Sequence, residues 1–258
     1  MTFAAPPDAY DRLMGRYSYA LCEALTEAAG VEPDAAVLDV GAGTGMGTKR
    51  LVDLVGADRV AAVEPSETFV QALRERLPGS DVRHASAEAL PFEDDAFDAA
   101  LAHLVVNFMG DPDAGVGEMR RVTSPGGVVA ACVWDYAERM TLLATFWDTA
   151  ASLAPDGLGD RDERSGMRFA HEGELAELWR SAGLEDVRGG EIVVSAGYEN
   201  FEDLWEPFTR GVGPAGGYAT SLDGERQAAL RDEFRRRLDV GDGPFRLEAL
   251  AWYAAGRA

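Results

Sequence analysis

The chain has 258 residues, of which 47% are hydrophobic, and its 45 acidic residues outnumber 24 basic ones to give a net charge of −21. This length and apolar content suit a globular protein with a large buried core. The strong negative charge argues against nucleic acid or an anionic membrane as a partner.

Neither a targeting segment nor a membrane span is expected. The first ten residues lack a basic region followed by an apolar core, and no stretch approaches the roughly 18 apolar residues of a membrane helix. We therefore expect a cytoplasmic protein. Cys22 and Cys132 lie far apart and outside any Cys/His cluster, and the acidic residues 93–95 lack ligand spacing, so we expect no disulfide and no metal site.

The first half of the chain alternates helix-like and strand-like segments. Apolar spacing predicts a leader helix within residues 1–30, ended by Gly30. A helix begun by Asp111 as its N-cap is predicted to run to about residue 122. The predicted strands are 36–40, 59–63, 81–85, 97–104 and 128–134, with further helices around 51–55 and 69–77. This alternation favours a parallel sheet that is covered on both faces.

The second half is less regular. Helices are predicted at 140–154, 175–182, 201–212 and 223–238, and strands at 185–197 and 244–254. Residues 155–166 are expected to form a polar loop, and the paired glycines at 189–190 suggest a β-bulge. Without repeats or low-complexity tracts, we expect one domain over residues 1–258. In it, residues 36–135 form the core and residues 136–258 form a lid and the last strands.

A glycine-rich turn follows the first predicted strand, in the segment AVLDVGAGTG at residues 36–45. A strand, a glycine turn and a helix N-terminus together expose backbone N–H groups to a ligand and keep side chains away from it. Glu64 ends the next strand 19 residues after Gly45. Its carboxylate could accept hydrogen bonds from both hydroxyls of a ribose. The pattern therefore predicts a nucleoside site.

Two ligand classes use this geometry, and the spacing of the glycines bears on the choice. The dinucleotide fingerprint G-x-G-x-x-G/A fails from Gly41, where Met46 occupies the last position, and from Gly43, where Thr48 does. Asp39 lies just inside the strand, where a carboxylate would repel a pyrophosphate and attract a cationic ligand. The turn thus favours a cationic nucleoside over a dinucleotide.

Four successive segments resemble the motifs of class I S-adenosylmethionine (SAM)-dependent methyltransferases, especially the type 11 or ubiquinone-biosynthesis-like group. They are VLDVGAGTG, AAVEPS, AEALPFEDDAFDAAL and DPDAGVGEMRRVTSPGGVVAACVW, and the resemblance covers roughly residues 36–135. It implies an α/β fold of the Rossmann-like, doubly wound kind. The mostly parallel sheet would have seven strands, the last one antiparallel, with helical lid insertions. It also implies SAM as the cofactor.

The same resemblance implies which residues bind the cofactor. The glycines would approach its amino-acid part and ribose, Asp39 would orient the amino-acid end, and Glu64 would hold the ribose hydroxyls. Ser86 departs from the family pattern, which usually has an acidic residue against the adenine. The full set of expected cofactor-binding residues is Asp39, Gly41, Ala42, Gly43, Gly45, Glu64, Pro65, Ser66, Ser86, Ala87, Glu88, Ala102 and His103.

Methyl transfer from SAM is an in-line displacement that needs mainly alignment and exclusion of water. If the acceptor must lose a proton, His103 is the best-placed base, although a histidine at an apolar strand end is often a core residue. The expected acceptor is a small, mainly apolar or aromatic metabolite such as a phenol, quinol or enol. The residues expected to form its pocket are Tyr17, Asn107, Trp134 and Asp135.

Two other functions stay open. The chain could be an NAD(P)-dependent oxidoreductase, which the failed dinucleotide fingerprint argues against. It could also be a SAM-binding module without turnover, and nothing in the sequence separates that function from an enzyme.

Overall fold

The sheet of the computed structural model, which describes residues 7–258, has seven strands in the order β3-β2-β1-β4-β5-β7-β6. Strands β1 to β5 run parallel, and β7 pairs antiparallel with both of its neighbours. The strands are β1 (Val37–Val40), β2 (Val60–Glu64), β3 (Asp81–His84), β4 (Phe97–His103), β5 (Thr123–Trp134), β6 (Glu185–Tyr198) and β7 (Phe245–Arg257). The expected fold class is thereby confirmed, including the antiparallel last strand.

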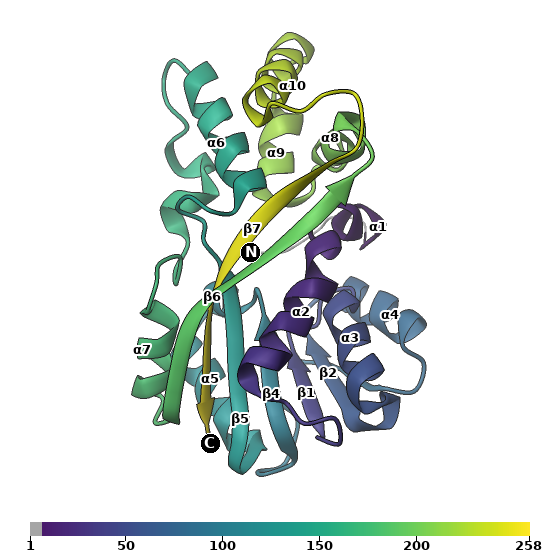
Figure 1. Cartoon of the computed structure of the whole chain (residues 1–258), viewed down its shortest axis with the longest axis vertical. Helices are drawn as coiled ribbons and strands as arrows, with labels where there is room; N and C mark the ends of the chain where they lie inside the picture. Colours follow the sequence, from purple (N-terminus) through teal and green to yellow (C-terminus); the bar gives the residue numbers. More distant parts are fainter. Residues whose placement is uncertain (1–6) are drawn as a thin grey trace.

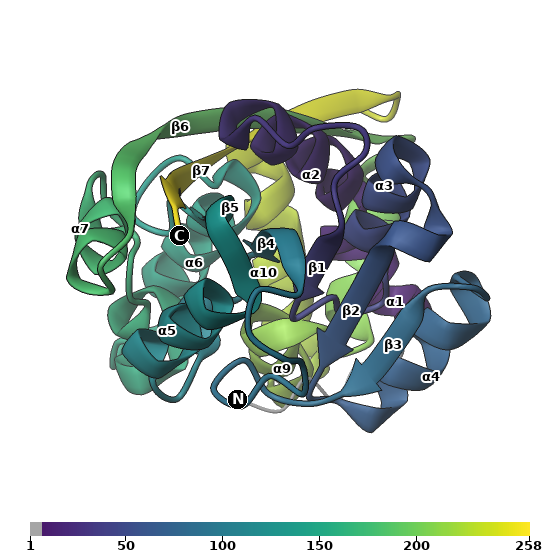
Figure 2. The ribbon, with the colours of Figure 1, turned by 90° about the horizontal axis from the view of Figure 1, so that it is seen from below.

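Helices cover both faces of this sheet. Figure 2 shows α2 and α3 on one face and α5 and α7 on the other. The helices are α1 (Pro7–Tyr10), α2 (Arg16–Ala29), α3 (Met46–Val55), α4 (Glu67–Arg76), α5 (Pro112–Val122), α6 (Thr141–Leu153), α7 (Glu174–Ser181), α8 (Phe201–Thr209), α9 (Gly213–Ser221) and α10 (Gly224–Leu238). As expected, Asp111 caps α5, where its side chain accepts a hydrogen bond from the Ala114 N–H. No helix within residues 7–258 is long and apolar enough to cross a bilayer.

Helices α6, α8, α9 and α10 gather beyond the end of the sheet at which β1, β4 and β5 finish (Figure 1). Buried aromatic rings hold this group together, and Phe146 of α6 stacks on Phe208 of α8 with 4.8 Å between ring centroids. Phe234 of α10 meets both rings edge-on. The aromatic stripe along residues 201–212 therefore serves mainly as the core of this helical layer, which lies over the carboxyl edge of the sheet.

The leader helix differs from the continuous helix expected within residues 1–30, of which residues 1–6 lie outside the described chain. A π-helical turn at Asp11–Gly15 separates α1 from α2. Asp11 there bonds to Thr44 of the glycine turn and forms an ion pair with Arg76 of α4 at 2.5 Å. The widened turn thus fastens the leader over the glycine turn. Gly30 ends α2 with a left-handed φ of 72°, as expected.

Two expectations for the strands were wrong. The bulge in β6 lies between Glu185 and Arg188, where Asp186 has a φ of 48°, while the glycines at 189–190 pair in regular register with β7. Strand β5 begins at Thr123, five residues before the expected strand at 128–134, and residues 124–127 are an irregular stretch within it. Residues 213–221, for which no element was predicted, form α9, although their sequence GPAGGYATS lacks helical apolar periodicity.

Candidate active site

The three glycines of the turn after β1 all have left-handed backbones, with φ between 57° and 90°, but they meet different surroundings. A Cβ atom on Gly41 would come within 2.5 Å of Val105, and one on Gly45 within 2.3 Å of Leu73. A Cβ atom on Gly43 would meet no atom within 4 Å. Two glycines therefore permit close packing of the protein on itself, and Gly43 alone leaves space open.

Glu64 ends β2 beside this turn and is almost fully buried. Its Oε2 accepts a hydrogen bond from the Gly43 N–H and its Oε1 one from the Ser66 N–H, both at 2.9 Å. Burial raises the pKa of Glu64, and these two N–H groups oppose the shift. The carboxylate oxygens keep further lone pairs, so they can also accept hydrogen bonds from a ligand.

A cavity of about 290 Å³, which we call the edge cavity, opens at the carboxyl ends of β1, β2 and β4. This volume is near the lower limit for small-molecule sites, roughly 300–1,000 Å³. Eight of the expected cofactor residues line it, namely Gly41, Gly43, Glu64, Pro65, Ser86, Ala87, Glu88 and His103. Ala42, Gly45, Ser66 and Ala102 are not among its lining residues, and neither is Asp39, which is buried and accepts a hydrogen bond from the Thr48 hydroxyl at 2.6 Å.

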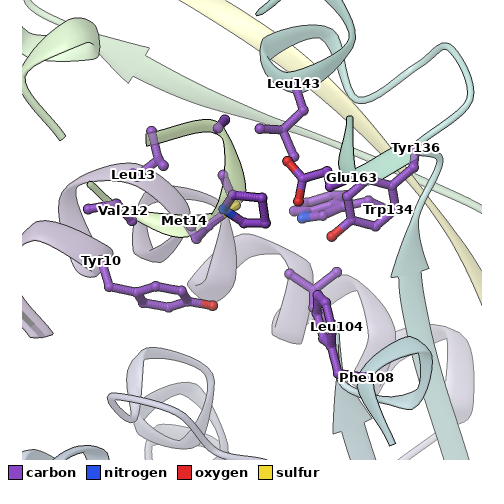
Figure 3. Close-up of a pocket in the computed structure, with 13 residues that line it drawn as sticks. Tyr10, Leu13, Met14, Leu104, Phe108, Trp134, Tyr136, Leu143, Glu163 and Val212 are labelled. Atoms are coloured by element: carbon purple, nitrogen blue, oxygen red, sulfur yellow. The ribbon is translucent and has the colours of Figure 1, made fainter. Parts of the chain in front are cut away.

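A second cavity of about 50 Å³, which we call the inner cavity, lies between the sheet edge and the helical layer (Figure 3). Its residues come from distant parts of the chain and are mostly apolar. They are Tyr10, Leu13, Met14, Leu104, Phe108, Trp134, Tyr136, Leu143, Glu163, Val212, Gly213, Pro214 and Ala215. Tyr10, Leu104 and Phe108 line both cavities, so the two spaces meet at these side chains.

Residues 38–131 match the profile of the methyltransferase domain family. The chain carries a methyltransferase domain. A demethylmenaquinone methyltransferase from Renibacterium salmoninarum is 37% identical to it over 155 residues, 60% of this chain and 64% of that protein. The ubiquinone/menaquinone biosynthesis C-methyltransferase UbiE of Burkholderia orbicola is 29% identical over 189 residues, 66% of this chain and 77% of that protein. The alignments span 39% to 64% of the length of the first relatives matched.

Solved structures share the fold of this methyltransferase domain. A SAM-dependent methyltransferase from Thermotoga maritima superposes with a TM-score of 0.56 at 20% sequence identity, covering 97% of this chain and 96% of the other. The sequence match over residues 38–131 confirms the expected methyltransferase family, with SAM as its cofactor, and the solved structure confirms the fold. The edge cavity occupies the carboxyl end of the parallel strands, where open α/β sheets bind nucleotides.

The residues of the methyltransferase domain fit this cofactor. The space beside Gly43 lets a ligand approach the backbone, and Glu64 presents a fixed carboxylate at the strand end. Glu88 faces the same cavity, with its Oε1 held by the Gly110 N–H at 2.8 Å. Although burial opposes the shift, the N–H groups of Gly110 and Asp111 and the Ser86 hydroxyl lower the pKa of Glu88, so it is ionised at neutral pH. Glu88 thus offers the acidic group that Ser86 lacks.

Six lining residues of the edge cavity are not among the expected cofactor-binding residues. They are Tyr10, Phe69, Leu104, Val105, Phe108 and Met109. Leu104 is distinctive only in the structure. Its backbone has a φ of 61°, in the left-handed region, which is uncommon for leucine and unexpected at the end of a β-strand. This conformation turns the chain directly after His103, at the junction of the two cavities. No signal for that turn is present in the sequence, since Leu104 is neither glycine nor asparagine.

His103 lies at the end of β4 with its Nδ1 3.4 Å from Asp39 Oδ1, and its buried Nε2 has no hydrogen-bond partner among residues 7–258. Burial lowers the pKa of the ring, but Cys22 and Asp39 beside it outweigh burial and raise that pKa well above its ordinary value. A protonated imidazole has no free electron pair with which to accept a proton. The role of His103 as a base stays a prediction, and this environment favours a positioning role instead.

Of the four residues expected around the acceptor, only Trp134 lines the inner cavity. The Tyr17 hydroxyl bonds to that of Tyr198 at 3.2 Å, and its buried ring meets Trp134 edge-on. Asn107 donates to the Met167 sulfur at 3.3 Å, and Asp135 accepts a hydrogen bond from the Glu138 N–H at 3.0 Å. These three side chains therefore support the walls rather than line the space.

Proposed function

We propose that the protein transfers a methyl group from SAM to a small, mainly apolar or aromatic acceptor. The observation that carries this proposal is the junction of the two cavities at Tyr10, Leu104 and Phe108. The edge cavity offers the polar groups that a nucleoside needs, and the inner cavity offers apolar and aromatic walls. A methyl donor in the first and an acceptor in the second would face each other across these three side chains.

The donor supplies a methyl group on a positively charged sulfur, which is a good leaving group. The protein then has to bind, align and exclude water. In this proposal Gly43 leaves room for the cofactor, Glu64 holds the ribose, and Pro65 and Ser66 border the adenine. Asp39, held by Thr48 and His103, keeps a negative charge beneath the turn, where it favours a cationic ligand.

The acceptor we propose is a phenol or quinol. The similarity to methyltransferases named for demethylmenaquinone and for ubiquinone and menaquinone biosynthesis supports a quinol-type molecule. Residues 136–258 supply the helical layer over the inner cavity, and we propose that this layer acts as the lid that selects the acceptor. Because that cavity measures only about 50 Å³, the lid must open further to admit an aromatic ring.

Ligand-dependent stability tests the cofactor. SAM or S-adenosylhomocysteine should stabilise the fold by about 2.7 kcal/mol at a concentration of about 100 times its dissociation constant. NADH and NADPH should give no stabilisation, because the turn lacks the spacing for a pyrophosphate. Thermal unfolding scans with each ligand measure this. Stabilisation by NADH without any by SAM would refute the proposal in favour of an oxidoreductase.

Glu64→Ala tests the site of the ribose. The variant should weaken SAM binding by about 1.5–3 kcal/mol, the range for hydrogen bonds to a charged group. Part of this loss would come from the turn itself, since Glu64 also holds the Gly43 and Ser66 N–H groups. Calorimetric titration of Glu64→Ala beside Glu64→Gln, which keeps one acceptor oxygen, separates the two contributions. Unchanged affinity in both variants would show that the ribose lies elsewhere.

A further inference from the structure

Glu163 places a carboxyl group in the otherwise apolar and aromatic inner cavity. It lies in a short 3-10 turn between α6 and α7, and only 8% of the residue is exposed. Its Oε1 accepts a hydrogen bond from the indole N–H of Trp147 at 2.9 Å, which leaves Oε2 for the cavity. Figure 3 shows the carboxyl group among Leu143, Trp134 and Tyr136.

Trp134 adds a hydrogen-bond donor to the same cavity. This residue is only 1% exposed, and its buried Nε1 has no hydrogen-bond partner within the described residues. Buried indole N–H groups usually find a partner. Beside the tyrosines Tyr10 and Tyr136, the inner cavity therefore contains an unsatisfied donor, Trp134 Nε1, and an acceptor, the Glu163 carboxyl group, between mostly apolar walls.

This pair distinguishes between classes of acceptor molecule. A hydroxyl group can donate its proton to Glu163 and accept a hydrogen bond from Trp134 on the same oxygen. An ammonium group could pair with Glu163, but it has no lone pair to offer to the indole N–H. A hydrocarbon would leave both groups unsatisfied. The arrangement thus fits an aromatic ring that bears a hydroxyl group.

We propose that Glu163 and Trp134 bind the hydroxyl group of a phenol or quinol acceptor, and that Glu163 is the base that removes its proton. This inference rests on the methyl transfer proposed above. The acceptor's O–H bond breaks, its proton binds Glu163, and the electron pair stays on the acceptor as a phenolate. Trp134 Nε1 donates a hydrogen bond to that oxygen, and the freed electron pair, on oxygen or on a ring carbon, becomes the nucleophile for the methyl group.

The surroundings of Glu163 suit this role. Burial raises its pKa to about 7, although the Trp147 N–H opposes the shift. A base with a pKa near the working pH exchanges protons effectively. The charged and titratable groups around it are Tyr10, Tyr136, Asp148, Asp162 and Arg164. Arg164 forms ion pairs with Asp148 and Asp162 at 2.7 and 2.8 Å. Its positive charge is therefore largely neutralised and does little to lower the pKa of Glu163.

A binding experiment tests the pair without any turnover. Phenol and toluene have nearly the same shape but only phenol has a hydroxyl group, and their dissociation constants can be measured by ligand-observed NMR with saturating S-adenosylhomocysteine. The wild type should bind phenol at least about 10-fold more tightly than toluene at pH 8. Glu163→Gln and Trp134→Phe should each reduce this preference several-fold. Glu172→Gln, which changes an exposed carboxylate outside the inner cavity, should leave it unchanged. If Glu163→Gln and Trp134→Phe both kept the wild-type preference for phenol over toluene, the proposal would be overturned.

Turnover then tests the base. With a quinol acceptor, wild-type kcat should rise with pH through about 7 as Glu163 loses its proton. Glu163→Gln should lower kcat by about 100- to 10,000-fold and remove this pH dependence, with SAM affinity within about twofold of the wild type. If kcat still rose with pH through about 7 in Glu163→Gln but no longer did so in His103→Gln, the assignment of Glu163 as the base would be overturned. A wild type that prefers phenol and binds SAM, yet transfers no methyl group, would refute the proposed function while supporting the binding pair.

Discussion

Gly43→Val is expected to abolish SAM binding while the fold survives. The new side chain would point into the edge cavity, where a Cβ atom on Gly43 meets no protein atom within 4 Å. The cofactor is proposed to fill that space, so the branched side chain would collide with it. The left-handed φ of 57° adds a strain of about 1–2 kcal/mol to any residue with a Cβ atom. Calorimetric titration should show SAM affinity reduced by more than about 100-fold, or about 2.7 kcal/mol.

A matched variant separates the collision from the strain. Gly159 also has a φ of 57° and open space around its missing Cβ atom, but it lies between α6 and α7 and does not line either cavity. Gly159→Val should therefore lose a similar amount of stability and keep wild-type SAM affinity. Wild-type affinity in a cooperatively folded Gly43→Val protein would contradict the proposed site.

The parallel core could be predicted from the sequence because its signals are local. Each buried strand is a short apolar run, and each following helix has its own cap or apolar period, as in the Asp111 cap of α5. The glycine turn and Glu64 were also predictable as neighbours. In a βαβ unit, parallel strands bring their carboxyl ends to one edge of the sheet, and Glu64 does bond to the Gly43 N–H there.

The inner cavity could not be predicted, because its residues meet only through tertiary packing. Tyr10 comes from the leader, Trp134 from the end of β5, and residues 212–215 from the start of α9. Glu163 stands in a stretch so polar that we expected a solvent-exposed loop, PDGLGDRDERSG. Its burial depends on Trp147, a residue 16 positions earlier on another element. The pattern of polar and apolar residues within 155–166 does not indicate this contact.

Three residues that were predicted to line the acceptor pocket do not line the inner cavity. Tyr17, Asn107 and Asp135 are polar residues placed by the sequence close to strand ends or the leader, which made them plausible acceptor contacts. In the structure each of them makes a hydrogen bond to a neighbouring protein group, namely the Tyr198 hydroxyl, the Met167 sulfur and the Glu138 N–H. The sequence indicates that a polar residue is near the site, but only packing decides whether it points into the cavity.

Glu163→Gln should also stabilise the protein at alkaline pH, through the same burial that suits Glu163 to act as a base. Burial raises its pKa in the folded protein from 4.5 to about 7. Between these values the folded state holds a proton that the unfolded state has released, so the free energy of unfolding falls as the pH rises. The fall is about 3 kcal/mol, since each pKa unit corresponds to about 1.4 kcal/mol. Glutamine does not titrate and still offers an oxygen to the Trp147 N–H.

The difference between variant and wild type should therefore be small at pH 4, grow between about pH 4.5 and 7, and approach about 3 kcal/mol at pH 8. Urea unfolding of both proteins at each pH measures it, and Glu172→Gln provides the exposed control, in which no such difference should develop. A difference that stays constant with pH would show that Glu163 ionises normally and is not buried as described. With the expected loss of turnover, the variant would be the more stable and less active protein, because a carboxylate held ready in an apolar cavity is costly to the fold and useful only to the reaction.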